Sequence, residues 1–107
     1  MSLTVAAAPG AFAKSSPKNL AGRQKTAVSL SWTASAGVTT YEYCFSRVAP
    51  TANQTSCDTG WVSVSTSRTA SVSSLLRTTT YYWQVRAVNS VSTTYANGGT
   101  WWQFTTG

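Results

Sequence analysis

Residues 79–88 have the sequence TTYYWQVRAV, in which every second position carries an apolar or aromatic side chain. These alternate residues are Tyr81, Trp83, Val85 and Ala87. Successive side chains of a β-strand point to opposite faces, so these four residues share one face and Tyr82, Gln84, Arg86 and Val88 share the other. The pattern predicts a central strand with one buried face and one face open to water or a partner.

The same alternation recurs along the chain, and no window shows the 3.6-residue apolar period of a helix. Further strands are expected at residues 27–33, 39–47, 61–65, 69–74 and 100–106, with a weak first strand at 12–20 that Pro17 interrupts. In the strand at 61–65, Val62 and Val64 are expected to face the core. The connection at 89–99 is rich in Ser, Thr, Asn and Gly and is expected to be mobile. Seven short strands predict an all-β fold, a seven-stranded antiparallel immunoglobulin-like sandwich rather than a barrel.

Size and charge limit the range of functions. The 107 residues suffice for one domain, expected at residues 12–107, after a starting segment and linker at 1–11. Eight Lys and Arg stand against only Glu42 and Asp58, which gives a net charge of +6. The basic residues are scattered, so nucleic-acid binding is not expected. The diffuse positive charge suggests weak attraction to anionic polymers, which is one of three hypotheses for the function. No segment is long and apolar enough to span a membrane.

Cys44 and Cys57 are the only cysteines, and the chain has no histidine. A zinc site needs four ligands, and a redox motif needs a Cys-x-x-Cys spacing, so a disulfide is favoured over two free thiols. A bridge of this spacing would stabilise the fold by about 3 kcal/mol. It also favours an oxidising compartment, which predicts an extracellular or cell-surface location.

Four short motifs occur together: Leu75-x-x-x-Thr79-x-Tyr81, Trp83-x-Val85-x-Ala87, Leu30-Ser31-Trp32-Thr33 and Tyr41-x-Tyr43. With them the chain resembles a fibronectin type III domain, and its bridge and aromatic density are similar to the bacterial and archaeal surface-protein branch of that family. The resemblance implies a sheet of strands A, B and E packed on a sheet of G, F, C and C′. It also implies that the Tyr81 hydroxyl bonds backbone near Leu75. Arg77 departs from the family, because a Pro is common at that position.

Catalysis finds little support in the residue types. Without histidine a serine nucleophile lacks its usual base, and a bonded Cys44 cannot attack a substrate. Glu42 and Asp58 are the only carboxylate pair, and Glu42 is expected to form a cross-strand ion pair with Arg86. The chain is therefore interpreted as non-enzymatic, with no cofactor and no metal.

Binding has one candidate surface, the outer face of the G-F-C-C′ sheet. The alternation places there Trp61, Tyr82, Gln84, Arg86, Trp101 and Gln103. Flat aromatic rings with polar neighbours suit sugar rings or a protein interface; the alternative is that these side chains pack on one another and on the disulfide. The core is expected to contain Trp32, Tyr41, Tyr81 and Trp83. Asn53-Gln54-Thr55 matches an N-glycosylation acceptor.

These observations predict a non-catalytic spacer or accessory module of a larger secreted or surface protein. Its expected partners are neighbouring domains of the same polypeptide. The alternative is a carbohydrate- or protein-binding platform on the outer G-F-C-C′ face, with a polysaccharide or another surface protein as partner.

Overall fold

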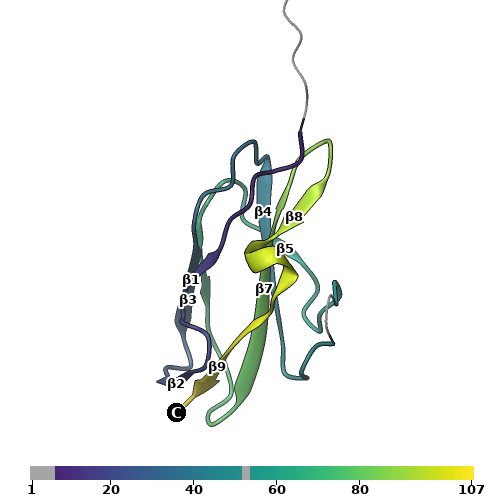
Figure 1. Cartoon of the computed structure of the whole chain (residues 1–107). Helices are drawn as coiled ribbons and strands as arrows, with labels where there is room; N and C mark the ends of the chain where they lie inside the picture. The colour runs from purple at the N-terminus through teal and green to yellow at the C-terminus, as the bar shows by residue number, and fades with distance from the viewer. Residues whose placement is uncertain (1–6, 52–53) are drawn as a thin grey trace, which may run out of the picture.

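The computed structural model describes residues 7–51 and 54–107 as an all-β protein with two sheets (Figure 1). The smaller sheet has the order β1-β3-β6, formed by Lys14–Ser16, Val28–Trp32 and Thr69–Val72. The larger sheet has the order β2-β9-β7-β4-β5, with β8 also paired to β7. Its strands are β2 (Ala21–Gln24), β4 (Thr40–Ser46), β5 (Val62–Ser63), β7 (Thr80–Val88), β8 (Thr93–Tyr95) and β9 (Trp102–Thr106).

The two sheets share one hydrophobic core, as in a β sandwich. The predicted inner face of β7 is buried, with Tyr81 4% exposed and Trp83, Val85 and Ala87 not exposed at all. Leu30 and Trp32 of the smaller sheet belong to the same core. The residues expected there, Trp32, Tyr41, Tyr81 and Trp83, are at most 4% exposed. The Tyr81 hydroxyl accepts a hydrogen bond from Leu76 N at 2.8 Å, next to the residue that the resemblance implied.

The first segment corrects the expectation of seven antiparallel strands, because it supplies two strands to two sheets. β1 pairs antiparallel with β3, and after Pro17 the chain crosses to the other sheet, where β2 pairs parallel with β9. Proline has no N–H to donate to a ladder, so pairing with β3 ends there. Leu20 N then donates to Gln103 O at 2.8 Å and starts the new pairing. The described residues form nine strands in all.

The connection at 89–99, expected to be a loop, contains β8 and the 3-10 turn η1 (Ala96–Gly99). β8 and β9 both pair with β7, at Arg86–Val88 and Thr80–Trp83 respectively, so η1 interrupts what would otherwise be one continuous strand beside β7. Within η1, Asn97 and Gly98 have positive φ angles of 56° and 63°, a conformation that Asn and Gly tolerate best. The turn therefore projects from the sheet between the two strands.

Two other expectations need adjustment. The strand expected at 61–65 is only β5, whose Val62 is 42% exposed, whereas Val64 packs against the core. Val62 is exposed because β5 is a two-residue strand at the edge of its sheet. Residues 7–11, expected as linker, run along the sandwich, where Gly10 N donates to Ala36 O at 2.8 Å. Residues 1–6 of that expected linker lie outside the described residues.

Candidate functional site

The connection between β4 and β5 covers the surface on which an open aromatic platform was expected. Trp61 Nε1 donates a hydrogen bond to Thr55 O at 3.0 Å. Trp101 Nε1 donates to Gln54 O, also at 3.0 Å. Both indoles are half-buried. The two rings on which a ligand was expected to stack instead hold the connection against the sheet.

The predicted disulfide closes this connection. Cys44 on β4 is bonded to Cys57, 13 positions further along the chain. The alternation of residues 39–47 places Cys44 on the face opposite Tyr41 and Tyr43, the outer face, yet it has no exposed surface. It is buried because the segment that the bridge closes folds back over the strand. The Asn53 glycosylation candidate lies within this segment but outside the described residues.

Arg86 occupies the centre of the expected platform. Its Nε donates to Glu42 Oε1 at 2.6 Å, which is the predicted cross-strand ion pair. Its guanidinium carbon lies 4.0 Å from the centroid of the Trp61 ring, in a cation–π contact. The Tyr95 ring packs edge-on against Trp61, with centroids 6.0 Å apart. Arg86 and Tyr95 therefore take up ring surface of Trp61 that a sugar would need.

Gln84 is a correction, because the outer face of β7 predicted an accessible amide and the structure buries it completely. Its Nε2 donates to Gly99 O at 3.1 Å, and its Oε1 accepts from Val85 N at 3.1 Å. The amide thus fills the gap in the ladder where η1 separates β8 from β9. Gln84 is a structural residue here and not part of a binding surface.

Tyr82 and Gln103 complete the expected set. They lie opposite each other in the β7–β9 register, and both are half-buried. Gln103 N donates to Asn19 Oδ1 at 2.9 Å, which ties this end of β9 to the segment before β2. Most of the six residues therefore contact other parts of the chain: the β4–β5 connection, Glu42 or η1. They do not form one open face.

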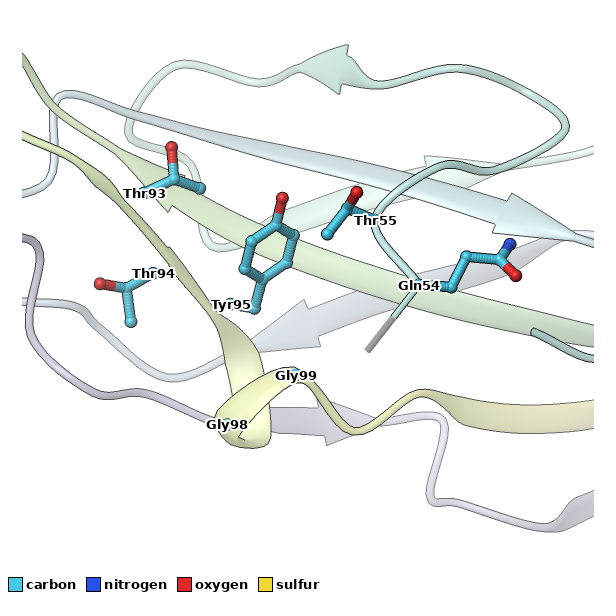
Figure 2. Close-up of a pocket in the computed structure, with 7 residues that line it drawn as sticks. All are labelled: Gln54, Thr55, Thr93, Thr94, Tyr95, Gly98 and Gly99. Carbon is cyan, nitrogen blue, oxygen red and sulfur yellow. The ribbon is translucent and has the colours of Figure 1, made fainter. Parts of the chain in front are cut away.

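A pocket of about 380 Å³ lies beside them, where the β4–β5 connection meets β8 and η1. Figure 2 shows the Tyr95 ring between the threonines of β8 and Thr55 of the facing connection. The lining residues are Gln54, Thr55, Thr93, Thr94, Tyr95, Gly98 and Gly99. They offer hydroxyls, an amide and one aromatic ring, without a charged side chain. Such a lining suits hydrogen bonding to a neutral hydroxylated ligand and offers no acid–base pair.

Sequence reasoning missed this pocket because it treated residues 89–99 as a loop. One signal was present: Thr93-Thr94-Tyr95 is a run of residues that favour strands. The pairing of β8 with β7 places Tyr95 opposite Arg86, and so brings it to the outer face. No local pattern indicates that η1 would fold back to form the pocket wall.

Lys14 was also missed. It is the one lysine of the described residues whose side chain is buried. It is 3% exposed, and its Nζ donates to Thr100 O at 2.6 Å and to Asn97 Oδ1 at 3.2 Å. The amine also lies 5.9 Å from the ring centroids of both Trp83 and Trp102. These contacts tie β1, the first strand, to the turn that precedes the last one.

Burial lowers the pKa of Lys14 to about 7, because the charged amine loses its water. A lysine of that pKa can act as a nucleophile or base in an accessible site. Here the side chain is enclosed by two indoles and a turn, so no substrate reaches it. Its role is to hold the turn η1.

Neither a membrane-spanning helix nor a metal-binding cluster occurs among the described residues. No helix among them has the length and apolar character needed to cross a bilayer. Nor do three or more His, Cys, Asp or Glu side chains come together among them where an ion would bind. Comparisons of the chain with protein-family models and with curated proteins found no match in either case.

Proposed function

We propose that this chain is a non-catalytic spacer or accessory module of a larger secreted or cell-surface protein, related to fibronectin type III domains. The observation that carries the proposal is the position of the two ends. The first described residues enter at one pole of the sandwich, and the C-terminus lies at the other (Figure 1). A module of this kind separates whatever is joined to its two ends by the length of the sandwich.

Hydrogen bonds fix the first described residues to the pole that they occupy. Asn89 Nδ2 donates to Ala7 O at 2.8 Å, and Ser35 Oγ donates to Gly10 O at 2.6 Å. Pro9 is buried in the same place, and Thr94 Oγ1 donates to its carbonyl at 2.6 Å. A segment held at these three points has a fixed direction where the described residues begin.

The other end is held in the same way. Gly107 N donates to Gln24 O at 2.9 Å, and Thr78 N donates to Gly107 O at 3.4 Å. The last residue is therefore bonded to two different segments. The disulfide adds support for the location, because such bonds persist in oxidising compartments outside the cytosol.

The proposal is tested by placing the chain between two globular marker domains and measuring small-angle X-ray scattering. We expect two markers at one fixed separation. A matched control replaces the chain with a Gly/Ser linker of equal length, which should give a broad range of separations. Scattering indistinguishable from that of the flexible control would contradict a spacer.

The Tyr95 pocket favours a second candidate function, contact with a neutral carbohydrate. Thr93 and Thr55 supply hydroxyls beside the ring, and the ring itself offers a surface for sugar C–H groups. Affinity electrophoresis in gels containing neutral polysaccharides should retard the chain, and Thr93→Val should reduce the retardation. Val91→Ser, an exposed change outside the pocket, is the control. Equal mobility in all gels would refute this function.

A further inference from the structure

Half of the basic residues lie at the pole that holds the C-terminus. Lys18, Arg23, Lys25 and Arg77 are all exposed. The backbone brings three of them together, because Gly107 bonds both Gln24 and Thr78, the chain neighbours of Arg23, Lys25 and Arg77. Lys18 follows Pro17, which lines one pocket with Arg23 and Lys25. Figure 1 shows β2, the C-terminus and the β6–β7 connection at this same end. Residues that are scattered in sequence thus form one basic surface, here called the basic pole.

Among the described residues, neither acidic side chain forms an ion pair with a cation of the basic pole. Glu42 is paired with Arg86 on the larger sheet. Asp58 Oδ2 accepts from Arg47 N at 3.3 Å and lines a pocket with Leu76, the chain neighbour of Arg77, so it is the acidic side chain nearest this pole. The basic pole therefore keeps a positive potential that neighbouring side chains do not cancel.

We propose that the basic pole is a docking surface for an acidic polysaccharide. Its concave part is a shallow pocket of about 420 Å³, to which Arg23 and Lys25 contribute cations and Ser16 and Ser29 contribute hydroxyls. Arginine binds sulfate and carboxylate groups through paired N–H donors, and serine hydroxyls complement the hydroxyls of a sugar. The inference goes beyond the spacer function and does not depend on it.

A nucleic acid is the other polymer that a positive surface attracts, and the pocket fits it less well. Proteins that bind single strands stack the bases on aromatic side chains. The residues that line this pocket include no aromatic ring. The disulfide also favours a compartment outside the cytosol. The chemistry of the surface and the compartment both favour an anionic sugar polymer.

The test measures binding of a fluorescent heparin fragment to the whole chain by anisotropy. Arg77→Gln removes one cation from the basic pole, and Arg68→Gln removes one from an exposed site outside it, so the two variants have equal net charge. We expect Arg77→Gln to bind about threefold to sixfold more weakly, and Arg68→Gln to bind nearly as the original chain does. Lys25→Gln/Arg77→Gln, which removes two cations of the basic pole, should bind about tenfold to thirtyfold more weakly. If three of the four cations contact the polymer, the affinity for heparin should fall about twentyfold to fortyfold between about 50 and 200 mM salt.

Three results would overturn the proposal. Absence of heparin binding at the lower salt concentration would show that the basic pole is not a docking surface. Equal losses in Arg77→Gln and Arg68→Gln would show that only total charge matters. Tighter binding of a single-stranded DNA of similar charge would assign the surface to nucleic acid instead. None of these results changes the separation of marker domains, so this proposal and the spacer function fail independently.

Discussion

At the scale of single residues, Lys14 makes the stability of the chain depend on pH. Its pKa is about 7 in the folded chain against 10.5 for the free side chain. Between these values the unfolded chain carries a proton that the folded chain lacks, so stability rises as pH rises. From pH 7 to pH 9 the rise should be about 2 kcal/mol. Urea unfolding at several pH values measures it.

Lys14→Met is the matched variant, because it keeps the length of the side chain and removes the charge. Its free energy of unfolding should not show the rise that the original chain shows above pH 7. The same rise in both proteins would assign the effect to another group. The alternation places residue 14 on a strand but does not predict its burial. That burial comes from η1, which folds over the amine through Asn97 and Thr100.

Gln84 carries a second prediction at this scale. Gln84→Leu keeps the volume but leaves Gly99 O and Val85 N without their partner. A buried polar group left unpaired costs about 1–3 kcal/mol, so the free energy of unfolding should fall by that amount. Hydrogen exchange of the Val85 amide should accelerate. Gln103→Leu, a half-buried change on β9, is the control, and equal effects of both variants would contradict the account.

At the scale of elements, the disulfide holds the β4–β5 connection over the larger sheet. Cys44→Ala/Cys57→Ala should lower the free energy of unfolding by about 3 kcal/mol, because the unfolded chain regains the entropy of an open loop. Guanidinium unfolding, followed by the fluorescence of the tryptophans, measures the loss. The Trp61 and Trp101 contacts to the connection should loosen, which shifts the folded emission. An unchanged midpoint would show that these hydrogen bonds alone hold the connection.

Elements also show what the sequence predicts well. Strands of strong alternation, β4 and β7, lie within one residue of their expected ranges at each end. The first segment and the 89–99 connection were predicted poorly, because their structure depends on partners far away in sequence. β2 exists through its pairing with β9, and β8 through its pairing with β7. The same limit left two readings of the aromatic face open, a platform or packed side chains: alternation says which face a side chain occupies, but not what covers that face.

At the scale of the whole molecule, the sandwich combines a rigid core with ends at opposite poles. The all-β class and the disulfide were predicted from residue patterns. The basic pole was not, since Lys25 and Arg77 are far apart in sequence and are brought to one end by the hydrogen bonds of Gly107. The spacer role therefore depends on how the two termini are fixed. A flexible end would rule out the spacer role, whereas the charges of the basic pole would remain.

The most direct test of the central claim is the distance distribution between spin labels at Ala8 and Arg77, which are exposed at the two poles. Labels introduced through ketone-bearing residues leave the disulfide intact, and double electron–electron resonance then reports the distribution. We predict one narrow peak at the separation given by the structure. A broad distribution, or a peak at short distance, would contradict a module that holds its two ends apart.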